Sequence, residues 1–106
     1  MQILINTGEG METSDALESH VRDKLGGVDR RFGDRLTRIE VYLKDVNAGK
    51  GGVDTACTME ARPKGLDPLV VEANAEDAYT ASHEAARRLE RALESRLGRK
   101  QDERRR

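Results

Sequence analysis

The chain has 106 residues, which is enough for one domain with one core, and no apolar run approaches the roughly 20 residues of a membrane helix. Its formal net charge is −1, aromatic residues make up 3%, and a single cysteine, Cys57, excludes a disulfide framework and a thiolate metal cluster. Because the N-terminus also lacks the basic and apolar segments of a signal peptide, we expect a cytoplasmic protein without metal or cofactor.

The first third of the chain predicts a strand followed by a helix. Residues 1–6 alternate in polarity, and Ser14 has the residue type and position of a helix N-cap. Gly26 and Gly27 interrupt the helix that follows, and each costs about 1 kcal/mol relative to alanine, so we expect a kink there. The apolar residues at helical spacing are Leu17, Val21, Leu25, Val28 and Phe32.

Three further strands follow. Residues 36–45 alternate most clearly, and residues 54–62 and 69–74 alternate too, with a turn at 63–68. Segments this close in sequence predict an antiparallel meander. In the first of these strands, the residues predicted to face the core are Thr37, Ile39, Val41 and Leu43.

A second helix is predicted from about Asp77 to Leu97, with Gly98 as its C-cap. The order strand, helix, three strands, helix predicts an α+β fold, in which a four-stranded sheet carries two helices side by side on one face. We expect residues 1–98 to form this domain and residues 99–106 to be a basic, disordered C-terminal tail.

Basic residues concentrate at the end of the chain. Residues 87–106 hold nine basic and four acidic side chains, whereas residues 1–86 hold ten basic and sixteen acidic ones. Such asymmetry is typical of nucleic-acid binding or of a basic tail. Helical projection places basic residues on one flank of each helix, and helices lying side by side would join these flanks as a groove wall: Lys24 and Arg31 on the first, and Arg88, Arg91 and Arg99 on the second.

A line of Lys and Arg suits a phosphate backbone, but ion pairs within the helix explain part of the same pattern. Arg88 follows Glu84 by four residues, and Arg91 precedes Glu94 by three. A solvated charged face therefore stays open as an alternative to an RNA-binding face.

Two stretches carry a resemblance to a known family. "MQILINTGEGMETSDALESHVRDKL" and, after the strands, "VVEANAEDAYTASHEAARRLERAL" resemble the ribosome hibernation-promoting factor and ribosome-associated inhibitor family, also called sigma-modulation proteins. The likeness covers roughly residues 1–100. Its most specific part is "ANAEDAY", where the small residue, the acid and the tyrosine of the family are Ala73, Asp77 and Tyr79.

The resemblance implies a fold like the double-stranded-RNA-binding domain with an added strand. It also implies binding to ribosomal RNA of the small ribosomal subunit, in the channel used by messenger and transfer RNA, by a short form that is monomeric when free. The residues matched to the RNA-contacting positions are Lys24, Arg88, Arg91 and Arg99; Arg31 shares their stripe by geometry alone, and His20, Arg87 and Lys100 are secondary candidates.

Several features separate this chain from the pattern of the family. Gly27 and Ser95 lie where basic residues are expected, and the first 86 residues are net acidic. An alternative hypothesis is therefore a protein-interaction module, in which the charged C-terminal helix pairs with a partner protein and ribosome binding is weakened or lost.

No residue pattern indicates an enzyme or a small-molecule substrate. The glycine-rich "GKGG" lacks the spacing and the Ser/Thr of a phosphate loop, and His20 and His83 lie on different helices without an evident nucleophile. Cys57 is predicted to be a buried, inert thiol, and Asp77 is predicted to cap the second helix.

Overall fold

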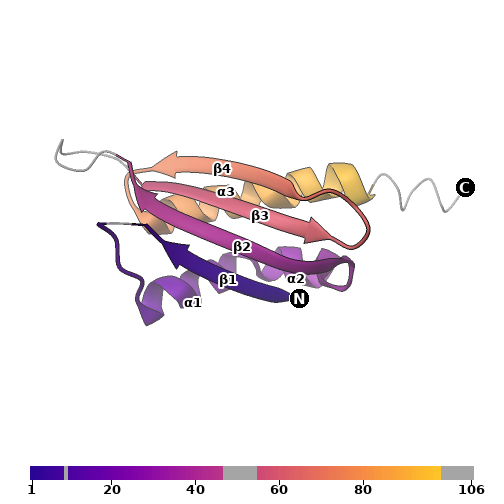
Figure 1. Cartoon of the computed structure of the whole chain (residues 1–106), viewed down its shortest axis with the longest axis horizontal. Coiled ribbons are helices and arrows are strands. Elements are labelled where there is room, and N and C mark those ends of the chain that lie inside the picture. The colour runs from indigo at the N-terminus through magenta and orange to yellow at the C-terminus, as the bar shows by residue number, and fades with distance from the viewer. Residues whose placement is uncertain (9, 47–54, 99–106) are drawn as a thin grey trace, which may run out of the picture.

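The structure, a computed structural model, describes residues 1–8, 10–46 and 55–98. Within them, four strands form one sheet in the order β1-β2-β3-β4. β1 is parallel to β2, whereas β2, β3 and β4 form an antiparallel meander (Figure 1). The strands are β1 (Gln2–Thr7), β2 (Leu36–Asp45), β3 (Thr55–Pro63) and β4 (Leu69–Ala75).

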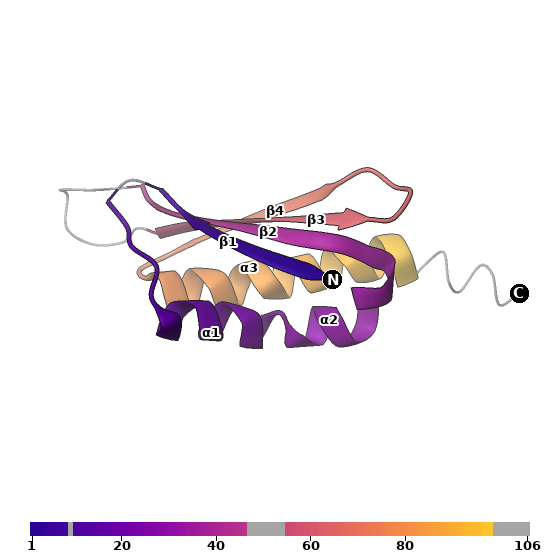
Figure 2. The ribbon, with the colours of Figure 1, turned by 60° about the horizontal axis from the view of Figure 1, so that its bottom comes forward.

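All helices of the described residues lie on one face of this sheet (Figure 2). α1 and α2 lie beside α3, so the helical layer has two parallel rows. This arrangement confirms the predicted α+β fold with its helices on one face. The helical segments are α1 (Asp15–Lys24), α2 (Gly26–Phe32), the short 3-10 turn η1 (Gly33–Arg35), α3 (Ala78–Leu93) and the π-type turn η2 (Glu94–Gly98).

The core lies between the two layers and is aliphatic, as the scarcity of aromatic residues predicts. Small residues of α3, such as Ala81 and Ala85, are fully buried and let its first half lie close to the sheet. The sheet contributes its inward alternate positions, and the largest of its fully buried side chains are Leu36, Ile39, Leu43 and Met59.

The first helical segment is two helices rather than one kinked helix. α1 ends at Lys24 and α2 begins at Gly26, with Leu25 between them at φ −86° and ψ 0°. Glycine weakens a helix because it exposes the backbone and loses the most conformational freedom on ordering. The buried Leu25 holds the junction against the core, so the chain continues in the same row.

One predicted side-chain direction is wrong. Thr37 is exposed, and Leu36 is buried instead, because the pairing of β2 with β3 shifts register between Leu36 and Arg38. Such an irregularity breaks the two-residue alternation on which the prediction depended. The predicted extent of the second helix is confirmed, although its last turn is not α-helical: α3 ends at Leu93, and the π-helical η2 continues the row to Gly98.

Both predicted N-caps are confirmed. Ser14 Oγ accepts a hydrogen bond from the backbone N–H of Leu17 at 3.1 Å. Asp77 Oδ1 accepts one from the backbone N–H of Thr80 at 2.8 Å, and this bond is the main reason why the pKa of Asp77 is lowered. The two caps fix where each row of helices begins.

Candidate nucleic-acid interface

Two exposed cations of α3 form a ridge on its outer side, which we call the Arg87/Arg91 ridge. Arg87 and Arg91 are both exposed and lie one helical turn apart. Within the part of the chain that the structure describes, neither side chain makes a hydrogen bond or an ion pair. Shallow hollows beside them are also lined by acids and by one further arginine: Glu84, Arg88, Glu90 and Glu94. The two guanidinium groups are thus available to an external anion.

Arg88 lies on another flank of α3. Its Nη1 donates a hydrogen bond to the backbone carbonyl of Glu72 in β4, with an N···O distance of 2.6 Å. Successive side chains along a helix are rotated by about 100°. Arg87 therefore points outward, whereas Arg88 points to the edge of the sheet. Arg88 therefore binds a strand at the border of the sheet and keeps only its remaining N–H donors for another group.

The predicted groove wall does not form, because the two basic flanks lie on opposite sides of α3. α1 and α2 pack along the side of α3 that carries Tyr79 and Glu90. The flank with Arg88 faces β4 instead. Projection gave the direction of each side chain around its own helix, but it could not tell on which side the neighbouring helix lies.

Arg31 lies between the helical rows and is paired with acids of α3. Its Nη1 is 3.0 Å from Glu90 Oε2, and its Nη2 is 3.7 Å from Glu94 Oε1. The guanidinium carbon also lies 4.9 Å from the centre of the Phe32 ring. The charge of Arg31 is thus compensated within the molecule, and the surface it would offer to RNA is less positive than the sequence suggests.

The candidates on α1 face the beginning of α3. His20 Nε2 lies 3.0 Å from the backbone carbonyl of Tyr79, and a carbonyl only accepts, so this nitrogen donates. Lys24 has Asp23 at 4.0 Å, and both Lys24 and His20 line a shallow hollow with His83. Arg99 and Lys100 lie outside the described residues, as do residues 101–106 of the predicted tail.

Three arginines that the sequence analysis did not single out bind backbone carbonyls. Arg22 donates to Ile3 at 3.4 Å, Arg96 donates to Asp67 at 2.9 Å, and Arg35 donates to Leu97 at 3.2 Å. Each joins a helical segment to a distant part of the chain. No spacing pattern reveals such contacts, because they depend on which strand end or turn comes to lie beside the helix.

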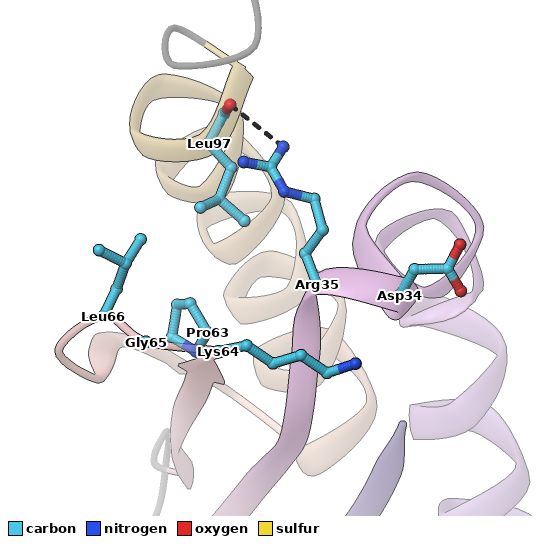
Figure 3. Close-up of a pocket in the computed structure, with 7 residues that line it drawn as sticks. All are labelled: Asp34, Arg35, Pro63, Lys64, Gly65, Leu66 and Leu97. Carbon is cyan, nitrogen blue, oxygen red and sulfur yellow. Dashed lines mark hydrogen bonds between the residues drawn. The ribbon is translucent and has the colours of Figure 1, made fainter.

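Arg35 borders a hollow of about 390 Å³ at the end of the molecule where η2 lies (Figure 3). Figure 3 shows its guanidinium directed to the carbonyl of Leu97, while the end of β3 contributes Pro63 and the β3–β4 turn contributes Leu66 to the rim. The hydrogen bond joins η1 to the end of the α3 row. We interpret Arg35 as a structural residue of this end.

On the face of the sheet that the helices leave uncovered, acidic and basic side chains form ion pairs with one another. Arg62 lies 2.6 Å from Glu60 and 3.7 Å from Glu40, and Arg38 lies 3.6 Å from the same Glu40. Tyr42 on this face is 48% exposed. Alternating acids and bases across neighbouring strands make this face a poor site for a polyanion.

Cys57 is fully buried, as predicted. Burial raises the pKa of its thiol to about 12, and a hydrogen bond with Ser82 acts in the opposite direction. A thiol that keeps its proton is a poor nucleophile and metal ligand. Within the described residues there is also no group of three or more His, Cys, Asp or Glu side chains able to hold a metal ion. In the same part of the chain, no helix has the length and apolar character needed to cross a membrane.

Comparison with models of known protein families identifies one match. The model of the family described as sigma 54 modulation protein / S30EA ribosomal protein matches residues 4–101, which is nearly the whole chain. The chain belongs to this family. The match confirms the resemblance found in the sequence, whereas the comparison with curated proteins finds no match.

Solved structures agree with this membership in the family. A ribosomal subunit interface protein from Coxiella burnetii superposes with a TM-score of 0.77 at 18% identity, over 92% of this chain and 99% of its own. The N-terminal domain of Protein Y from Thermus thermophilus has a TM-score of 0.73 at 27% identity, over 90% of this chain and 98% of its own. At 18% identity the first shows the fold alone.

Proposed function

We propose that this chain binds the small ribosomal subunit and blocks the channel used by messenger and transfer RNA, acting as a hibernation factor rather than as an enzyme. Two observations support the proposal. The family model matches residues 4–101, and a structure of the same fold is a ribosomal subunit interface protein. In addition, α3 presents to solvent the guanidinium groups of Arg87 and Arg91, which have no partner among the described residues, a pattern suited to phosphate.

The Arg87/Arg91 ridge is the observation that carries the RNA-binding part of the proposal. Residues four apart on a helix are neighbours, so the two guanidinium groups follow one line along the helix. Arginine binds phosphate through paired N–H donors, and each such contact releases counterions from the RNA. Lys24 adds a third cation from α1, and the free donors of Arg88 add a fourth from the edge of the sheet.

The protein-interaction module is less well supported. In that hypothesis, the mixture of Glu and Arg on the second helix would form ion pairs with a partner protein. Glu90 and Glu94 instead pair with Arg31 of the same molecule, so these acids already have partners. Arg87 and Arg91 of α3, which have no partner within residues 1–8, 10–46 and 55–98, are better suited to an anionic surface than to a mixed one.

Cosedimentation with purified small subunits tests the proposal. We expect the chain to pellet with subunits at low salt and to be released steeply as the salt concentration rises. We also expect it not to bind subunits whose channel already holds messenger and transfer RNA. Large subunits serve as the control and should retain much less protein. If the chain stays in the supernatant at low salt, or binds equally well to subunits with a filled channel, the proposed function is wrong.

A further inference from the structure

A shallow hollow of about 290 Å³ lies between α1 and the first turns of α3. Its lining combines an aromatic ring, two imidazoles and an ammonium group: Tyr79, His20, His83 and Lys24, with Thr80. It belongs to the same helical side of the molecule as the Arg87/Arg91 ridge. We call it the Tyr79 pocket.

The tyrosine of this pocket is held in place and yet is open to solvent. His20 donates to the Tyr79 carbonyl at 3.0 Å, and its ring meets the Tyr79 ring edge to face, with centroids 4.9 Å apart and an interplanar angle of 70°. Tyr79 is nevertheless 43% exposed. An aromatic ring fixed on one side and open on the other is a platform on which another ring can stack.

The charges around Tyr79 favour an anion next to the stacked ring. Lys24 brings an ammonium group from α1; it forms a long ion pair with the exposed Asp23 at 4.0 Å, and its own side chain is 33% exposed. The carboxylate of Asp77 is also near, but Thr80 occupies both of its oxygens, with the backbone N–H at 2.8 Å and Oγ1 at 3.1 Å. The acid is thereby used for capping, while the cation stays accessible.

We propose that the Tyr79 pocket binds one unpaired nucleotide of RNA, whose base stacks on the Tyr79 ring and whose phosphate contacts Lys24. Stacking on an aromatic side chain combined with a nearby cation is how proteins hold single-stranded RNA. This inference rests on the proposed function and adds a base-binding subsite to a surface that otherwise contacts only phosphates.

Intrinsic fluorescence offers a direct test, because the chain has two tyrosines and no tryptophan. In a Tyr42→Phe variant the emission comes from Tyr79 alone. We expect a short oligouridylate to quench this emission and an abasic ribose-phosphate oligomer of equal length to leave it unchanged. If neither oligomer quenches, if both quench alike, or if an acidic phosphopeptide quenches instead, the pocket does not bind a base.

Variants separate the pocket from the rest of the interface. Tyr79→Leu should weaken binding to oligouridylate and to small subunits by about tenfold, whereas Tyr79→Phe should bind like the unmodified chain, since it keeps the ring. Thermal unfolding of both variants checks that each is folded. If Tyr79→Leu is folded and pellets with small subunits as well as Tyr79→Phe does, the pocket is refuted while the proposed function stands. If oligouridylate quenches the Tyr79 emission but the unmodified chain does not bind small subunits, the proposed function is wrong and the proposed base-binding pocket is retained.

Discussion

Arg31 of α2 and Glu90 of α3 join the two helical rows through an ion pair with an N···O distance of 3.0 Å. Glu94 extends the pair at 3.7 Å. The side chains are partly exposed, at 45% for Arg31 and 35% for Glu90, so solvent screens the pair and its contribution to stability is small. Its larger effect is electrostatic, because it removes one cation from the surface that we propose faces RNA.

Neutralising the acids of this pair should strengthen ribosome binding. In Glu90→Gln/Glu94→Gln, Arg31 is released and two negative charges leave the helical side, so we expect several-fold tighter binding to small subunits at low salt. The free energy of unfolding should change by less than about 1 kcal/mol. Glu12→Gln/Asp34→Asn makes the same change in net charge at exposed positions elsewhere. Equal gains in both double variants would show that only net charge matters.

The two glycines at the α1–α2 junction should respond differently to alanine. A Cβ at Gly26 would meet only the flexible end of Arg30, at 3.2 Å, so Gly26→Ala should raise the free energy of unfolding by up to about 1 kcal/mol. A Cβ at Gly27 would lie 3.0 Å from Glu90 Oε1 and would push on the carboxylate that holds Arg31. Urea unfolding should therefore show a smaller gain for Gly27→Ala, and the reverse order would contradict this geometry.

The cap of α3 makes a prediction that depends on pH. Asp77→Ala should lower the free energy of unfolding by about 1 kcal/mol at pH 7, and Asp77→Asn by less, because asparagine also caps. The pKa of Asp77 is lowered in the folded state, chiefly by the Thr80 backbone N–H. Its charge therefore stabilises the fold above the unfolded pKa of 3.8, and this stabilisation is lost as pH falls through the folded pKa. Urea unfolding between pH 7 and pH 2 should therefore show a larger loss in the unmodified chain than in Asp77→Asn, since other groups titrate in both proteins.

Because the Cys57 thiol is buried, we expect the free energy of unfolding to fall at alkaline pH. Its folded pKa of about 12 is above the ordinary thiol value of 9.0, so the folded state keeps a proton that the unfolded state releases. The fold should lose up to about 1.4 kcal/mol per pH unit from this group once pH exceeds 9. Cys57→Ala is the control, because other groups titrate in both proteins. Parallel stability curves for the two proteins above pH 9 would argue against a buried, neutral thiol.

Much of the fold could be predicted because its elements have clear periodicity. The apolar stripe from Leu17 to Phe32 and the alternation around Ile39 predict the helical row and the central strand, and Gly26 marks the junction. Thr37 was misplaced because an irregularity of pairing with β3 has no signature in a two-residue pattern. Local periodicity thus predicts the helices and strands and the face that each one buries. It does not reveal an irregularity that pairing with a neighbouring strand imposes.

The candidate site could be predicted only in part, for a related reason. Helical projection gives the direction of Arg87 and Arg91 from the sequence, since that depends on the helix alone. The partners of Arg31 and Arg88 depend on contacts with segments 59 and 16 residues away, and these contacts decide which cations are occupied. The sequence predicts Arg31 and Arg88 as RNA-contacting residues. Because both have partners in the structure, Arg87 becomes the stronger candidate beside Arg91.

The central claim is that the Arg87/Arg91 ridge binds ribosomal RNA, and cosedimentation of Arg87→Glu/Arg91→Glu with small subunits across a salt series tests it most directly. The matched control is Lys44→Glu/Lys64→Glu, which makes the same change in net charge at exposed positions away from the ridge. We expect the ridge variant to lose binding at low salt and to show a shallower salt dependence, by about one unit of slope for each lost phosphate contact, while the control binds nearly as well as the unmodified chain. If the ridge variant binds as tightly as the control, with the same salt dependence, the ridge does not contact RNA.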